Sequence, residues 1–255
     1  MDFFVKKDSI VRQIWGNADT ILLIFAGASA EFALNKAVDW LYFTGSLPSD
    51  PLARLFSTVA YAQKIVFSEK EKALSAIDQI TAVHQSVEAS RNAKIPDWAY
   101  RDVLFMLIDY SIRSFELLER KLDDAEKEEV FDVFYRVGKR MGLKGLPENY
   151  FDWLVMRVDH IQNNLMKSEF TVDLFTQYHK HLGLIRYQIL LETQALVLPG
   201  RVSKLLNYRN LSWMQPILYF YKFSRKLKLE YLIKSIILPS AYQSRIKALD
   251  LTKDL

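Results

Sequence analysis

One histidine of this chain lies in a series of apolar side chains that recur at helical spacing. Ala73, Ile77, Ile80, His84 and Val87 are separated by four, three, four and three residues, which places them on one face of an α-helix. An imidazole on a buried face needs a hydrogen-bond partner or a bound ligand. The pattern therefore predicts either a core histidine bonded to a hydroxyl or carbonyl, or an axial ligand of a haem or metal ion.

The stretch before this histidine carries a second set of side chains that share one helix face. Arg54, Thr58, Tyr61 and Ile65 are separated by four, three and four residues. A guanidinium in line with two hydroxyl groups suits a carboxylate partner, including a haem propionate. The alternative is a solvent-exposed stripe in which Arg54 pairs with an acidic residue.

Glu31 ends the most apolar run of the chain, residues 20–30. That run is shorter than the ~20 residues of a spanning helix, so we expect a buried core helix, with a membrane-embedded hairpin as the alternative. A buried carboxyl without a partner has a raised pKa and can relay protons. Glu31 is therefore a candidate proton relay, unless it pairs with an arginine or a lysine.

The remaining residue types exclude several kinds of site. The chain has no Cys, which removes disulfides, thiolate metal sites and cysteine nucleophiles. It has no glycine-rich phosphate loop and no Glu-x-x-His metal motif. We expect no chemical role for His160. His179 and His181 are expected at the surface, because a spacing of two residues turns about 200° around a helix.

The segments that carry these residues show the apolar spacing of helices throughout, so the predicted fold class is all-α. Half of the 255 residues are hydrophobic, and only 8 are Gly and 7 Pro, which favours long elements with few turns. Ser68 is expected to cap its helix in a capping box, and Asp123 or Asp124 to cap another. The expected helices span 10–15, 19–43, 51–66, 68–90, 97–121, 125–141, 148–167, 172–182 and 184–196.

The composition changes after Pro199 and Gly200. Residues 201–255 hold eleven Lys or Arg and three acidic residues, a net charge of +8, whereas residues 1–200 carry −4. We expect a single all-α domain over 1–255, with a core at 10–200 and a basic aromatic section at 201–255. Residues 211–238 are basic and aromatic, which is typical of peripheral membrane contact. A helix packed on the core with a solvated basic edge is the alternative, and no nucleic-acid-binding module accompanies the charge.

Together, these residues resemble a known family. The resemblance covers roughly residues 10–245 and rests on the order and spacing of short motifs. The chain carries an Asp-Pro-x-x-Arg-Leu-x-x-Thr pattern followed by His-x-x-Val, formed by Asp50, Pro51, Arg54, Leu55, Thr58, His84 and Val87. This pattern is similar to that of the MpaB and rubber-oxygenase (latex-clearing protein) family.

The resemblance implies a globin-like helical core that binds haem b. It implies that His84 is the proximal ligand of the iron, with Arg54 and Thr58 close to the haem as cofactor-binding and catalytic residues. The activity it implies is O₂-dependent cleavage of carbon–carbon double bonds in an isoprenoid chain. Its partners are then O₂ and an apolar small molecule, with no nucleic acid.

The chain departs from the family pattern at three places. Some rubber oxygenases have a distal lysine directly before the motif threonine, and this chain has Ser57 there, a poor ligand for iron. Residues 33–37 stand where the family often has His-Pro, and Glu88 stands where a glycine is common. The chain is therefore similar to a divergent member, for which rubber itself is not the expected substrate.

The predicted function is a haem-b-dependent oxygenase-like enzyme that oxidises or cleaves an isoprenoid- or lipid-like substrate. Two alternatives stay open: a non-catalytic helical protein that binds a lipid or a membrane surface, and a haem protein without oxygenase activity. No secretory signal is evident at residues 1–8, because no apolar stretch follows the first charges. The expected location is cytoplasmic, with membrane-peripheral contact as a further expectation.

Overall fold

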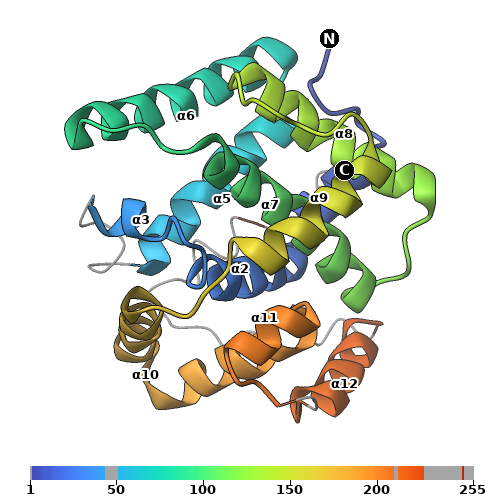
Figure 1. The fold of residues 1–255 in the computed structure, drawn as a ribbon. Helices are drawn as coiled ribbons and strands as arrows, with labels where there is room; N and C mark the ends of the chain where they lie inside the picture. Colours follow the sequence, from blue (N-terminus) through green and yellow to red (C-terminus); the bar gives the residue numbers. More distant parts are fainter. Residues whose placement is uncertain (1, 44–50, 210–211, 227–248, 250–255) are drawn as a thin grey trace.

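The structure is a computed structural model that describes residues 2–43, 51–209, 212–226 and 249. Within helices, the side chains of 51–55 and 223–226 lie outside this description. The described residues form helices joined by short connections, with two isolated bridges and no strand (Figure 1). The all-α prediction is therefore confirmed. The helices are α1 (Ile10–Gly16), α2 (Ala18–Phe32), α3 (Asp39–Phe43), α5 (Pro51–Phe67), α6 (Lys70–Arg91), α7 (Asp97–Leu118), α8 (Asp124–Arg140), α9 (Tyr150–Asn163), α10 (Glu169–Val197), α11 (Gly200–Leu205) and α12 (Met214–Lys226).

Helix α2 lies at the centre of the molecule, packed along α7 and against α10 and α1. Ile21, Ile24 and Ala30 are buried in the core, because apolar side chains cover almost the whole circumference of this helix. The prediction of a buried core helix at 20–30 is confirmed. Within the described residues, no helix combines the length and apolarity needed to cross a bilayer.

Gly27 permits the close approach of α2 and α7. A Cβ atom at this position would lie 2.3 Å from two ring carbons of Tyr110. The Tyr110 side chain is fully buried, and its hydroxyl donates to Glu31 Oε2 at 2.8 Å. The ring therefore has no room to move away from an added methyl group.

Replacing Gly27 by alanine is expected to lower the free energy of unfolding by about 1–3 kcal/mol, the range typical of overpacked cores. Urea unfolding followed by circular dichroism measures this change. Gly200→Ala is the control, since a Cβ there meets no atom within 4 Å. Equal stability of both variants would show that α2 and α7 separate easily.

The predicted helix starts are correct where local side chains provide the cap. Asp123 accepts from the backbone of Glu126 while the Glu126 side chain accepts from Asp123, a complete capping box. Pro51 is the first residue of α5, whereas Asp50 lies outside the described residues. The capping box at Ser68 is wrong. Helix α6 begins at Lys70, whose N–H donates to Asp2 O, because the segment at Phe3 forms a bridge with Glu69 instead.

The single helix predicted at 19–43 is interrupted at 33–38, because the chain turns after Phe32 before α3 begins at Asp39. Residues 34–36 run alongside 164–166 instead, where Met166 N donates to Leu34 O and Lys36 N donates to Asn164 O. Asn35 stabilises this turn, since its Oδ1 accepts from Ala37 N at 2.8 Å. The same pairing ends α9 at Asn163, four residues before the predicted end.

Helix α10 is one element with a sharp kink. Gly183 has φ +70° and ψ 170°, a conformation that L-residues rarely adopt. The two predicted helices at 172–182 and 184–196 are therefore correct in position, separated by this glycine. Figure 1 shows α10, α11 and α12 together along one edge of the molecule.

Candidate functional site

A cavity of about 550 Å³ opens between α2, α5, α6, α7, α8 and α10. Its lining is mostly apolar, and none of the described side chains around it is Asp, Glu, Lys or Arg. Its size lies within the range of small-molecule sites. The polar side chains of the lining are Ser29, Asn35, Ser57, Thr58, Tyr61, His84, Tyr100 and Tyr178.

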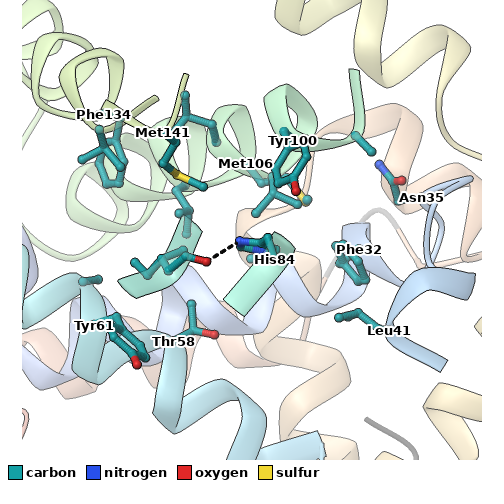
Figure 2. Close-up of a pocket in the computed structure, with 18 of the residues that line it drawn as sticks. Phe32, Asn35, Leu41, Thr58, Tyr61, His84, Tyr100, Met106, Phe134 and Met141 are labelled. Atoms are coloured by element: carbon teal, nitrogen blue, oxygen red, sulfur yellow. Dashed lines mark hydrogen bonds between the residues drawn. The ribbon is translucent and has the colours of Figure 1, made fainter. Parts of the chain in front are cut away.

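His84 faces this cavity from α6, with Ile80 and Val87 on the same face. The ring is half-buried, and its Nδ1 lies 2.9 Å from the carbonyl oxygen of Ile80 (dashed in Figure 2). A carbonyl oxygen only accepts hydrogen bonds, so we assign a proton to Nδ1; in the neutral ring with this tautomer the lone pair belongs to Nε2. Histidines that ligate metals are held in the same way, by donation of the other ring N–H to a carbonyl.

Tyr100 of α7 covers one side of the imidazole. Its ring meets the His84 ring edge to face, with centroids 5.3 Å apart and planes at 77°. The Tyr100 hydroxyl donates to Glu88 Oε1 at 3.1 Å, and the same oxygen accepts from Ile95 N at 2.9 Å. Burial and the charge of Glu88 raise the pKa of Tyr100 above its ordinary value. Glu88, one of the departures from the family pattern, therefore fixes the residue that packs against His84.

Some of the residues predicted to lie near His84 line the same cavity. Thr58, Tyr61 and Ile65 line the cavity from α5, and Figure 2 shows Thr58 and Tyr61 on the opposite side of His84 from Tyr100. Ser57 also lines the cavity. Arg54 lies one helical turn before Thr58 in α5, and its side chain lies outside the described part of the chain.

Glu31 belongs to a buried cluster of charges rather than to the cavity. Its side chain is fully buried, and Arg157 of α9 donates to both of its oxygens at 2.5 and 2.7 Å. Arg157 also donates to Asp109 Oδ2 at 2.9 and 3.0 Å. Tyr110 and His160 contact the remaining lone pairs of Glu31. A carboxylate with this many donors is ionised.

The expectation of a raised pKa at Glu31 is wrong. Burial does raise the pKa of this carboxyl, but the charge of Arg157 and the hydrogen bonds from Arg157 and His160 outweigh burial and bring it to about 2. A carboxyl this acidic does not relay protons at neutral pH. The alternative of pairing with an arginine is correct.

His160 lies among buried carboxylates that the sequence did not indicate. It is buried at the centre of the cluster, with Nε2 2.9 Å from Glu31 Oε1 and Nδ1 in an ion-pair contact with Asp102 Oδ1. Both ring nitrogens face oxygens that only accept, so we assign the doubly protonated imidazolium. Burial lowers the pKa of His160, but the bonds to Asp102 and Glu31 outweigh burial and raise it. His179 and His181 are exposed, as predicted.

The cluster reaches the cavity through Asn35. Asn35 Nδ2 donates to Asp102 Oδ2 at 3.1 Å, and Asn164 Nδ2 donates to the same carboxylate at 2.9 Å. Asn35 lies in the lining of the cavity, to one side of His84 in Figure 2. The ion pairs of α2, α7 and α9 therefore fix one wall of the cavity without placing a charge in it.

The chemistry of this donor set fits a haem. An imidazole with its Nδ1–H bound to a carbonyl, beside apolar walls and hydroxyl groups, suits a proximal iron ligand. Across the described residues, no group of three His, Asp or Glu side chains forms a site for a metal ion bound by protein alone. His84 and Thr58 are thus the predicted residues that the structure brings to one cavity, and Tyr100 and Asn35 are those that sequence reasoning missed.

The comparison with known families agrees with this geometry. No curated protein and no solved structure matched the chain. Residues 13–219, most of the chain, match the family model of a catalytic domain described as ER-bound oxygenase mpaB/B′/rubber oxygenase. That span includes α2, α5 and α6 and every residue of the cavity lining. The chain therefore belongs to the mpaB and rubber oxygenase catalytic domain family, and its matched part is an oxygenase-type catalytic domain.

Proposed function

We propose that the protein is a haem-b-dependent oxygenase that acts on an apolar, isoprenoid- or lipid-like substrate with O₂. The observation that carries the proposal is the orientation of His84 in the cavity. Its Nδ1–H is held by Ile80 O, which leaves Nε2 as the ring nitrogen that would donate its lone pair to iron. Membership of an oxygenase family supports the same activity.

The cavity residues have separate parts in this proposal. His84 would ligate the haem iron, and the haem would supply the activation of O₂ when bound. The resemblance gives Arg54 and Thr58 positions close to the haem, and Thr58 lines the cavity accordingly. Ser57 stands where some relatives have lysine, and its short hydroxyl would be a poor ligand for the iron.

The apolar lining favours the proposed substrate class. Phe32, Leu41, Phe134 and Met141 bound the cavity on either side of His84 in Figure 2. Such walls exclude water and gain free energy by burying a hydrocarbon chain, about 25 cal/mol per Å² of apolar surface. A charged substrate would find no Asp, Glu, Lys or Arg side chain among the described lining residues.

The test compares the visible spectra of the wild type and His84→Ala after expression with added haem. We expect a Soret band in the wild type, and in the variant a haem affinity weakened by about 100-fold or more, since loss of a ligand exceeds the 10–100-fold cost of losing its supporting bonds. O₂ consumption with an isoprenoid substrate is expected to fall with the Soret band. His181→Ala is the matched control, because His181 is exposed on α10.

Two outcomes contradict the proposal. Absence of a Soret band in the wild type after haem titration would leave a helical lipid-binding protein as the better account. A haem spectrum without O₂ consumption on any apolar substrate would instead identify a haem protein without oxygenase activity. His84→Gln separates the first case further, since a protein that needs only packing at this position tolerates that change.

A further inference from the structure

Helix α12 carries an exposed apolar stripe. Trp213, the residue directly before the helix, Ile217 and Phe220 follow one another at steps of four and three residues, with 49%, 40% and 71% of their surfaces exposed, so they lie along one side. Tyr219 beside this stripe is 76% exposed. An exposed aromatic stripe of this kind marks an interaction site rather than an ordinary surface helix.

Two polar contacts attach α12 to the body of the protein. Tyr221 donates its hydroxyl to Asp19 Oδ2 at 2.7 Å, and Lys222 Nζ donates to Leu117 O at 3.0 Å. The orientation of α12 is thereby fixed from two neighbouring helices, α2 and α7. Tyr221 follows Ile217 by four residues and so borders the stripe, whereas Lys222 lies on the face opposite Trp213.

The kink of α10 adds two aliphatic side chains on the same side. Leu184 and Ile185 follow Gly183 directly and are 72% and 77% exposed. Ile185 lies two turns before Glu192 on one face of α10, a rise of about 10 Å. Glu192 accepts from Trp213 N at 3.2 Å, so Ile185 and Trp213 lie on the same side of α10. We call Leu184, Ile185, Trp213, Ile217, Tyr219 and Phe220 the C-terminal apolar surface.

Exposed basic side chains flank the elements of this surface, Lys180 before the kink and Arg209 before α12. Residues 201–255 carry +8 by sequence, in part at positions outside the described residues. The carboxylates that contact this region are hydrogen-bonded: Glu192 accepts from Ser212 and Trp213, and Asp19 accepts from Tyr221. Basic side chains beside exposed Trp, Tyr and Phe match the headgroup region of an anionic bilayer, where aromatic rings and cations are both stabilised.

We propose that the C-terminal apolar surface binds the surface of an anionic lipid bilayer. Helix α12 lies in the plane of the interface, with its stripe at the boundary of headgroups and acyl chains about 5–10 Å deep, and the α10 kink enters beside it. The sequence predicted membrane contact through residues 211–238. The proposed contact uses residues 213–220 of that segment and adds residues 184 and 185 of α10. Residues 227–238 lie outside the described residues. The inference goes beyond the proposed function, since it requires no haem.

The experiment measures flotation of the full chain with vesicles of phosphatidylcholine alone and of phosphatidylcholine with about one third phosphatidylserine. We expect binding to the anionic vesicles at about 0.1 M salt, and at least about fivefold weaker binding at about 1 M salt, where the Debye length is short. Phe220→Glu and Ile185→Glu should each weaken binding by about tenfold or more. Haem-free and haem-loaded protein should bind alike, so failure of the oxygenase proposal leaves this result unaffected.

The matched control is Phe151→Glu. Phe151 lies on α9 with 65% of its surface exposed, so the substitution has the same chemistry at a different face, and we expect binding within about twofold of the wild type. All three replaced side chains are exposed, and circular dichroism checks that each variant is folded. Three results would each overturn the proposal: no binding of the wild type to anionic vesicles, equal binding to neutral vesicles, or an equal loss in the Phe151 variant.

Discussion

Replacing Arg157 by methionine is expected to lower the free energy of unfolding by about 3–5 kcal/mol, the cost of breaking a buried ion pair by removing one partner. Arg157 is 4% exposed and Glu31 fully buried. Methionine fills much of the arginine volume, so the main loss is electrostatic. The Glu31 and Asp109 carboxylates would then remain buried without the guanidinium that bonds both of them.

Thermal unfolding measures this loss, and an effect of this size lowers the midpoint by roughly 10 °C in a chain of this length. The control is Arg140→Met on α8. Two nitrogens of Arg140 donate to the Asp78 carboxylate at 2.7 and 2.8 Å. Unlike the buried pair, both of these side chains are about half exposed. We expect the Arg140 variant to unfold close to the wild-type midpoint, because water screens exposed pairs. Similar losses in both variants would contradict a special role for burial.

The double variant Arg157→Met, Glu31→Gln separates lost attraction from stranded charge. If the uncompensated Glu31 carboxylate causes most of the loss, neutralising it in the Arg157→Met background restores stability instead of removing more. We therefore expect the double variant to lose less free energy of unfolding than the sum of the two single losses. Strict additivity would show that Arg157 acts through packing alone.

Local sequence signals predicted the helix boundaries that local side chains determine. The capping box of Asp123 and the first residue of α5 at Pro51 follow from residues a few positions apart. The break after Phe32 does not, because Asn35 and Leu165 are far apart in sequence and their pairing arises only in the folded chain. The same reason explains Ser68, whose expected role at the start of α6 is replaced by pairing with the N-terminal segment.

The sequence predicted the candidate site about as well as it predicted the helix boundaries. The family resemblance placed His84 and Thr58 at one site, and the periodic helix faces that carry them both border the cavity. The apolar run before Glu31 marked this residue as buried, but it carried no information about the partner on α9, and the partner decides the direction of the pKa shift. For His160, Asp159 was the neighbour in sequence, whereas the contacts come from α2 and α7.

The stability of the protein is expected to fall in acid as Glu31 takes up a proton. A carboxyl with a lowered pKa contributes stability above its ordinary pKa, here 4.5, and that contribution is lost as the pH falls through the folded-state pKa of about 2. The difference corresponds to about 3 kcal/mol. His160 has the opposite sign: its raised pKa adds stability below pH 6.5 that is lost as the pH rises through its folded-state pKa.

Urea unfolding at a series of pH values tests this dependence, with Glu31→Gln and Asp78→Asn as the variant and its control. Glu31→Gln should be less stable than the wild type near neutral pH and lose much of the fall between pH 4.5 and 2, because no titrating group remains at that position. Asp78→Asn should keep the wild-type acid profile, since the Asp78 carboxyl is exposed to water. An unchanged acid limb in Glu31→Gln would contradict the assignment of the acid sensitivity to Glu31.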